Sequence, residues 1–340
     1  MQIVKSLTRE DLESIAGTGE IAYAECEASF LSRHAPNGFA EKPWTEISRD
    51  ESLGREAGQR LFDISVKLDI CVYRGTKLGQ LAREKADDAN PILQALGIEE
   101  VHESNAIAML YSIKKKCLGG LAMLTHDAPE GYARIGETGG FDAEREELHA
   151  MFGKVPIVVY GSALTKANPA DVDTMVILPA FNEEVYRKIC GRCDTNRKPL
   201  LSMVIVPAEY FYVFAMNDTE MEERWSRVAS GCIEVPMAGK ERHTRLVQSN
   251  AASMYTRMRK ALLPERLDAL AIIHRLNYIL KQPKFIARKL SELCGAQIPE
   301  PSINRFESLP SRQEMVDALV QANFSAYDAM SAYQRIENQQ

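Results

Sequence analysis

Two aspartates open one apolar run of the sequence, and a Gly-Ser pair closes the apolar run before it. The first run is 157–160, followed by Gly161 and Ser162, and the second begins with Asp171 and Asp173. Short apolar runs of this kind are typical of buried strands. Side chains alternate between the two faces of a strand, so both carboxylates point the same way, about 7 Å apart by the rise per residue. Such a pair can hold a hard divalent cation, Mg²⁺ or Mn²⁺.

The Gly-Ser pair adds a feature that can bind phosphate. A glycine directly after a strand, here Gly161, lets the backbone approach a ligand closely. The hydroxyl of Ser162 and the N–H groups that follow can bind phosphate oxygens where a helix begins. The alternative is an ordinary surface turn, marked by the Asn-Pro dipeptide between the two runs and capped by Asp171 and Asp173.

This order of features resembles the signature of the polymerase-β-type nucleotidyltransferases: an apolar strand, Gly-Ser, a spacer, then Asp-x-Asp at the start of the next strand. Gly161, Ser162, Asp171 and Asp173 match these positions, and the resemblance covers about residues 150–216. It implies that the aspartates hold Mg²⁺ (or Mn²⁺) and that the Gly-Ser turn seats the β- and γ-phosphates of a nucleoside triphosphate. An acceptor hydroxyl would then attack the α-phosphorus and release pyrophosphate.

The family usually carries a third catalytic carboxylate on a later strand of the same sheet. The matching apolar run here, 200–206, contains no acid. Either Glu209, just past this run, acts from a loop, or Ser202 takes the third position and the site binds nucleotide without efficient transfer. Two alternatives to an enzyme therefore stay open. One is an inactive nucleotide- or nucleic-acid-binding protein, and the other is a structural or interaction protein that keeps the fold.

The charge distribution predicts a polyanionic partner. The net charge is -6, yet residues 240–290 contain twelve Lys or Arg and three Asp or Glu, a net charge of +9. This segment also has helical periodicity, and Arg257, Arg259 and Lys260 cluster within it. We expect these three residues to bind an RNA backbone, with a tRNA-like end as the acceptor and a protein hydroxyl as the second choice. The alternative is the solvated face of amphipathic helices.

Composition predicts a cytoplasmic protein. Of 340 residues, 45% are apolar and 26% charged, and neither a signal peptide nor a run of ~20 apolar residues is present. Seven cysteines at irregular spacings do not predict a disulfide framework. Cys190 and Cys193 follow a helical stretch at 182–189 rather than preceding one, which favours two reduced thiols over a redox or zinc site.

The expected architecture is α+β, with a small mixed-sheet nucleotidyltransferase core at 141–240. A mostly helical N-terminal region of unknown role, 1–126, and a linker, 127–140, would precede it. A helical domain, 241–340, basic in its first half, would follow. Within these regions we expect a strand at 62–73, although the same residues fit a helix face. We also expect a solvated helix face at Lys114, Lys115 and Lys116, and a core or interface position for His274.

Overall fold

The computed structural model describes most of the chain, in two compact units. The first unit is Pro43–Gly239, and the second combines Lys240–Gln340 with Met1–Lys42. The described residues are 44, 47, 51–73, 77–169, 171–192, 200–218, 227–237, 239, 240, 242, 244 and 269–339. The boundary between the units falls at residues 239 and 240, next to the helical domain predicted from residue 241. Residues 43–126 belong to the same unit as the sheet, with no division at the predicted linker 127–140.

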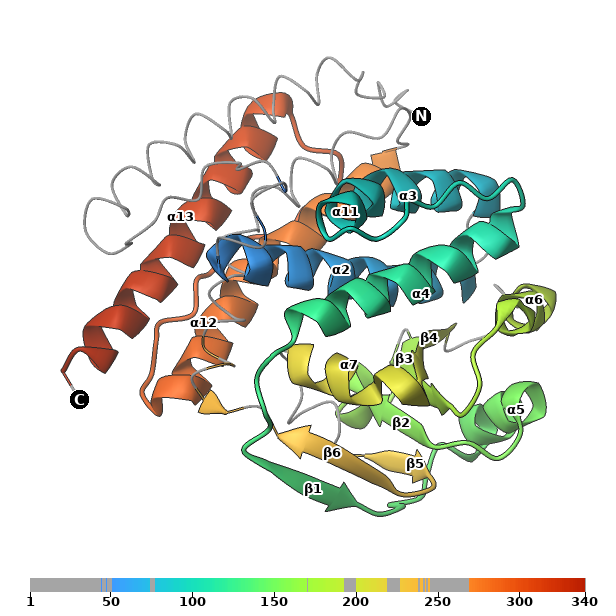
Figure 1. Ribbon diagram of the computed structural model, residues 1–340. Coiled ribbons are helices and arrows are strands. Elements are labelled where there is room, and N and C mark those ends of the chain that lie inside the picture. Colours follow the sequence, from blue (N-terminus) through green and yellow to red (C-terminus); the bar gives the residue numbers. More distant parts are fainter. Residues whose placement is uncertain are drawn as a thin grey trace. The chain divides into compact units, whose positions relative to one another are not determined.

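A four-stranded mixed sheet forms the centre of the first unit (Figure 1). Its order is β4-β3-β2-β5, with β2 at Ile157–Tyr160, β3 at Asp171–Leu178, β4 at Leu200–Pro207 and β5 at Val228–Ser230. Strand β3 pairs antiparallel with β2 and parallel with β4, and β5 pairs antiparallel with β2. Every residue of β2 is buried, which explains an apolar run without alternation. The chain is therefore of mixed α+β class, as expected.

A smaller antiparallel pair and several helices complete this unit. The pair is β1, Gly131–Ile135, with β6, Ile233–Met237. The helices are α2 (Glu51–Tyr73), α3 (Leu78–Ala95), α4 (Ala106–Leu124), α5 (Asp142–Phe152), α6 (Glu183–Arg192) and α7 (Phe211–Asn217), with short 3-10 turns η2 (Gly161–Leu164) and η3 (Ala208–Tyr210). Helix α6 confirms the helical stretch predicted at 182–189.

The strand predicted at 62–73 is wrong, because this run lies inside helix α2. Leu61, Leu68 and Val72 are at most 1% exposed, whereas Val66 and Ile70 are only partly buried. The buried residues follow the period of a helix, so the helix face was the correct alternative. The solvated face predicted at 114–116 is also wrong in part, since Lys114 is fully buried while its neighbour Lys115 is exposed.

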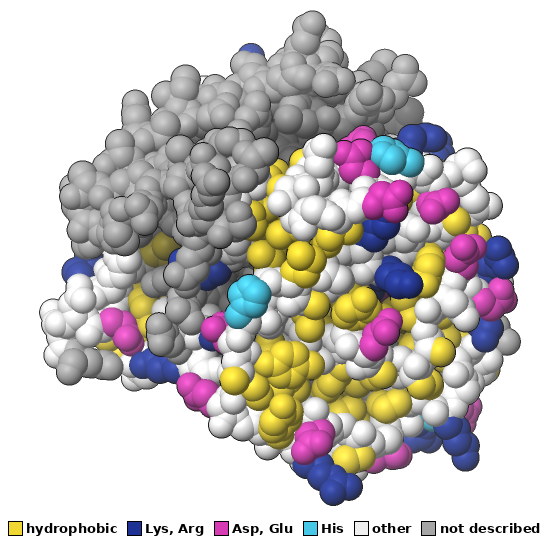
Figure 2. All heavy atoms as spheres, in the orientation of Figure 1, with side chains coloured by type: hydrophobic (Ala, Val, Ile, Leu, Met, Phe, Trp, Pro, Cys, Tyr) yellow, Lys and Arg dark blue, Asp and Glu magenta, His cyan; other side chains and the backbone are white. Residues whose placement is uncertain are grey.

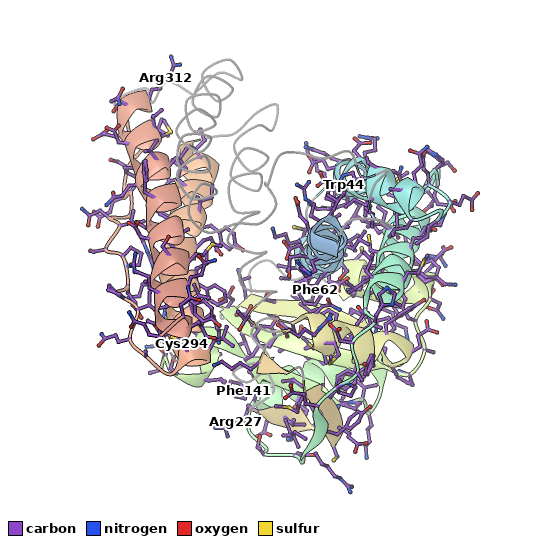
Figure 3. The ribbon with its side chains drawn as sticks, turned by 60° about the vertical axis from the view of Figure 1, so that its left-hand side comes forward. Trp44, Phe62, Phe141, Arg227, Cys294 and Arg312 are labelled. Atoms are coloured by element: carbon purple, nitrogen blue, oxygen red, sulfur yellow. The ribbon has the colours of Figure 1, made fainter. Side chains whose placement is uncertain are left out.

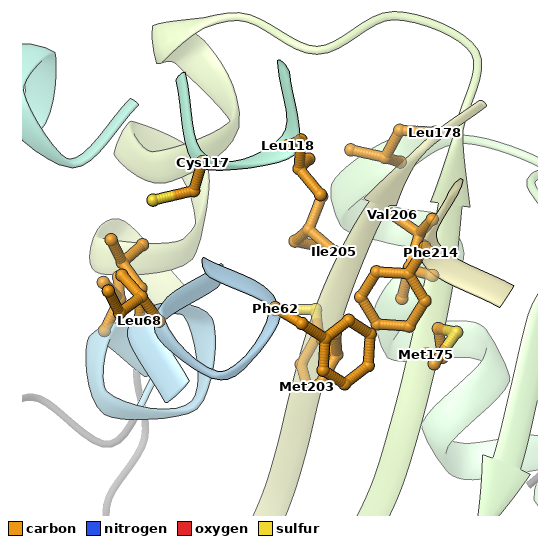
Figure 4. Packing of buried hydrophobic residues seen from close by; sticks show 14 of the residues in the cluster. Phe62, Leu68, Cys117, Leu118, Met175, Leu178, Met203, Ile205, Val206 and Phe214 are labelled. Carbon is orange, nitrogen blue, oxygen red and sulfur yellow. The ribbon is translucent and has the colours of Figure 1, made fainter. Parts of the chain in front are cut away.

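Helices α2, α4 and α7 cover the sheet through one hydrophobic core. The rings of Phe62 on α2 and Phe214 on α7 lie 4.7 Å apart between centroids, and Figure 4 shows both beside Met203 of β4. Helix α4 packs closely on α2 at Gly120, where a Cβ atom would lie 2.9 Å from Leu61 Cδ1. The helical layer and the sheet therefore form one folding unit rather than two domains.

The described part of the second unit is helical. It consists of α11 (Ala269–Leu280), α12 (Gln282–Cys294) and α13 (Arg312–Glu337). Helix α13 begins with a capping box between Ser311 and Glu314. Cys294 and Arg312 lie at opposite ends of the α12 and α13 pair (Figure 3), so the two helices run in the same direction. Their shared core includes Leu290 and Leu319.

Some sequence predictions fall on residues that the structure does not describe. These are Cys193, Arg257, Arg259 and Lys260, together with the side chain of His274. Among the helices that are described, none is both long and apolar enough to cross a membrane.

Candidate functional site

The two aspartates lie at the beginning of β3, which is less buried than the rest of the strand. Asp171 and Asp173 are both partly exposed, while Val172 between them is buried. This alternation places both carboxylates on one face of the sheet. Asp173 is paired across the antiparallel ladder with Tyr160, the last residue of β2. The Gly-Ser turn that follows Tyr160 therefore begins directly beside the aspartates.

Gly161 is in close contact with one of these carboxylates. Its φ is +76°, and a Cβ atom at this position would lie 2.7 Å from Asp173 Oδ2. A positive φ strains any residue with a side chain, and here the space for one is also occupied. Ser162 follows in η2, where its backbone oxygen accepts hydrogen bonds from the N–H groups of Thr165 at 3.3 Å and Lys166 at 3.0 Å. The structure thus brings Gly161, Ser162, Asp171 and Asp173 together.

Ser202 lies beside Asp173 on the neighbouring strand. In the parallel ladder between β3 and β4, Asp173 is paired with Ser202, which is 1% exposed. Paired residues on neighbouring strands face the same side of a sheet, so Ser202 points to the side of Asp171 and Asp173. The Thr174 hydroxyl donates a hydrogen bond to the backbone oxygen of Ser202 at 3.0 Å, which reinforces this register.

Glu209 does not lie at the site, and its assignment as the third carboxylate needs correction. It belongs to η3, after Pro207, and Pro207 is paired with Leu178 at the far end of β3. Because β3 and β4 are parallel, the residues that follow β4 lie at the end opposite to Asp171 and Asp173. Ser202 and Pro207 are five positions apart, about 16 Å of strand. A side chain of this size cannot span that distance.

Two carboxylates are enough to hold Mg²⁺ when a ligand supplies further oxygens. Within the described residues there is no group of three or more His, Cys, Asp or Glu that could hold a metal ion. Mg²⁺ is nevertheless commonly bound through one or two carboxylates together with substrate phosphates and water. Asp171 and Asp173 fit this type of site and do not fit a structural site built from protein ligands alone.

The sequence reasoning missed a buried ion pair elsewhere in the unit. Lys114 Nζ lies 2.5 Å from Asp69 Oδ2, and both side chains are 0% exposed. Burial raises the pKa of Asp69 and lowers the pKa of Lys114, and the opposite charge of each partner counteracts both shifts. The signal was present in the sequence, since Lys114 is in helical phase with the buried residues Leu110 and Cys117.

The basic segment is partly neutralised by the fold. Lys284 pairs with Glu300 at 2.9 Å, Lys289 pairs with Glu292 at 2.9 Å, and Lys240 pairs with Glu337 at 3.3 Å. Lys240 and Glu337 are 97 residues apart, whereas the other two pairs join residues that are 16 and three positions apart. In the first unit, acidic and basic side chains are intermixed over the face in Figure 2. The net charge of +9 therefore overstates the positive field of this segment.

Five cysteines are described. Cys71, Cys117, Cys190, Cys232 and Cys294 form no disulfide with one another. Cys190 lies in the last turn of α6, so its place at a helix end is as predicted.

Comparisons of the chain with protein-family models, with curated proteins and with solved structures found no match. A functional assignment must therefore come from the residues of the chain itself.

Proposed function

We propose that the protein is a Mg²⁺-dependent nucleotidyltransferase. The observation that carries the proposal is the contact between Gly161 and Asp173, at a turn that leads into two aspartates on one strand face. An ordinary capped turn does not require a glycine in close contact with a carboxylate. A site that must bring triphosphate oxygens close to the backbone and to a metal ligand does require one.

Each residue of the candidate site has a separate role in the proposed reaction. Asp171 and Asp173 would hold the cation, which when bound supplies positive charge against the triphosphate. Gly161 leaves room for the β- and γ-phosphates, and the Ser162 hydroxyl can donate a hydrogen bond to a phosphate oxygen. The acceptor hydroxyl would attack the α-phosphorus in line, the bond to the β-phosphate oxygen would break, and pyrophosphate would leave.

RNA is the acceptor class that the charge pattern supports. Residues 240–290 carry a net charge of +9, and Arg257, Arg259 and Lys260 cluster within this segment. A basic segment of this kind favours polyanions over cationic small molecules. A tRNA-like end is therefore the first acceptor to test, and a protein hydroxyl is the second.

The decisive experiment compares the parent protein with Asp173→Ala. Each α-labelled nucleoside triphosphate is incubated with Mg²⁺ and total RNA, and label incorporation and pyrophosphate release are measured. Loss of a metal-binding carboxylate should reduce transfer by at least about 10³-fold. Asp87→Ala is the matched control, because Asp87 is an exposed carboxylate on α3 and should leave transfer unchanged. Undiminished turnover in Asp173→Ala would contradict the proposed mechanism.

A second candidate is nucleotide binding without transfer, and the position of Ser202 favours it. Where the family usually has a third carboxylate, this chain has a buried hydroxyl paired with Asp173. Mg²⁺-dependent binding without incorporation or pyrophosphate release would support this candidate. Binding alone is visible as a thermal shift, since a ligand at 100 times its dissociation constant adds about 2.7 kcal/mol. Absence of any nucleotide-dependent shift would instead favour a structural or interaction protein.

A further inference from the structure

Strand β4 is an edge strand, and a side chain from the helical layer binds its outer edge. The order β4-β3-β2-β5 leaves one side of β4 without a strand partner among the described residues. Buried backbone N–H groups on such an edge need another acceptor. For Ile205 that acceptor is Asp69 of α2, whose Oδ2 receives the backbone N–H at 2.8 Å. Helix α2 thus holds the strand that carries Ser202.

Asp69 also joins two further helices to this edge. Lys114 of α4 donates to Asp69 Oδ2 at 2.5 Å, and the Tyr186 hydroxyl of α6 donates to Asp69 Oδ1 at 2.8 Å. Lys114 donates in addition to the backbone oxygen of Ser65 at 2.7 Å. Helix α6 is the connection between β3 and β4. One carboxylate therefore ties α2 and α4 to the β3-α6-β4 segment, which carries both aspartates of the candidate site.

This arrangement is poorly explained by stability alone. The side chains of Asp69 and Lys114 are 0% exposed, and withdrawing two charges from water offsets much of their attraction. Apolar side chains of similar volume are often as stable in such places. The Asp69 carboxylate additionally requires β4 to be in one register relative to α2, because only that register brings the Ile205 N–H to it. A slip of one residue in β4 would turn the Ile205 N–H away from Asp69 and would move Ser202 away from Asp173.

We propose that Asp69 is a positioning residue for the site formed by Gly161, Asp171 and Asp173, and that it acts by fixing β4 against β3. Asp69 does not touch the site itself, because Ile205 lies three residues beyond Ser202, about 10 Å along the strand. The proposal depends on the proposed function for what the site binds. The fixing of β4 can be measured independently of any ligand. It also gives residues 51–124 a role, which the sequence did not provide.

The test uses the double variant Asp69→Leu/Lys114→Met, which removes both charges and leaves no buried ion, so the fold is expected to persist. Amide hydrogen exchange of the full chain is followed by mass spectrometry in β4 and in β2. We expect the amide of Ile205 to exchange about tenfold faster or more, as for the loss of one charge-assisted hydrogen bond, while β2 is unchanged. The affinity for Mg²⁺ with nucleoside triphosphate should fall by a similar factor.

Leu93→Ala is the control for a general loss of stability. Leu93 is 0% exposed on α3, which packs against α2 and α4. This variant should lower the melting temperature and accelerate exchange in β4 and β2 by the same factor, through global opening, without weaker nucleotide binding. Unchanged exchange of Ile205 in the double variant, or an equal loss of affinity in both variants, would overturn the proposal. If the parent protein binds no nucleotide, the proposed function fails, and exchange of Ile205 alone decides whether Asp69 fixes β4.

Discussion

Two groups of residues in the first unit, one with two aspartates and one centred on a single aspartate, differ in what surrounds the carboxylate charge. Asp171 and Asp173 stand side by side at the start of β3, and both are partly exposed. Asp69 is fully buried and is bound by the Lys114 ammonium, the Tyr186 hydroxyl and a backbone N–H. The first group brings two like charges together where solvent and solutes can reach them. The second group is neutralised inside the protein and is closed to solutes.

This difference separates the proposed ligand site from a buried structural support. A carboxylate whose partners are all supplied by the fold can position other elements but cannot bind a cation or a substrate. A pair of like charges at an accessible strand end is stabilised when a cation binds to both carboxylates. Mutations in the two groups should therefore have different effects. A mutation in the buried group should lower the stability of the protein, and a mutation in the accessible group should weaken ligand binding.

The largest expected effect on stability is the removal of one charge from the buried pair. Lys114→Met leaves the Asp69 carboxylate buried without its counter-ion, which should cost about 3–5 kcal/mol of the free energy of unfolding. Asp171→Asn, the matched change in the accessible group, should stay within about 0.5 kcal/mol of the parent. Urea unfolding at neutral pH measures both. Equal costs for the two variants would show that the two groups do not differ as described.

A smaller loss of stability is expected from Gly161→Ala. The alanine must adopt a φ of +76° and would place its Cβ 2.7 Å from Asp173 Oδ2, so the carboxylate must rotate away. Backbone strain of this type costs about 1–3 kcal/mol, and displacement of the Asp173 carboxylate should also weaken Mg²⁺ and nucleotide binding.

Gly79→Ala is the control for this glycine substitution. Gly79 lies in α3, and nothing would lie within 4 Å of its Cβ. Alanine there should be neutral or stabilising by about 0.5–1 kcal/mol through helix propensity. A Gly161→Ala variant with parent stability and parent ligand binding would remove the main support for the candidate site.

Local patterns in the sequence were sufficient to place the accessible group. The order of Gly161, Ser162, Asp171 and Asp173 predicts two adjoining strands. The antiparallel pairing of Tyr160 with Asp173 places the Gly-Ser turn next to the aspartates. The third position could not be chosen in this way. Whether Ser202 or Glu209 faces Asp173 depends on the direction of β4 relative to β3, a long-range property. The parallel register selects Ser202.

The buried group could not be predicted, because its members come from four separate elements. Asp69 and Lys114 are 45 residues apart, and Asp69 and Tyr186 are 117 residues apart. Helical phase could have marked Lys114 as buried, but no local pattern names its partner. The run 62–73 was misassigned for a related reason. Its β-branched residues alternate by chance, and only packing against α4 and β4 shows that Leu61, Leu68 and Val72 form the buried face.

The smallest expected effect concerns the thiol of Cys117, one turn along α4 from Lys114 of the buried pair. Burial raises the pKa of Cys117 to about 12, whereas Cys232 is exposed. At pH 8 a thiol with that pKa is ionised in only about one molecule in 10⁴, and the thiolate is the reactive form. A maleimide should therefore label Cys232 within minutes and leave Cys117 unlabelled in the native protein.

Labelling of Cys117 should require opening of the α4 layer, so Lys114→Met should accelerate labelling of Cys117 without altering the rate at Cys232. Rapid labelling of Cys117 in the parent protein, identified by peptide mass spectrometry, would show that the buried group is open to solutes, and the contrast with Asp171 and Asp173 would be lost.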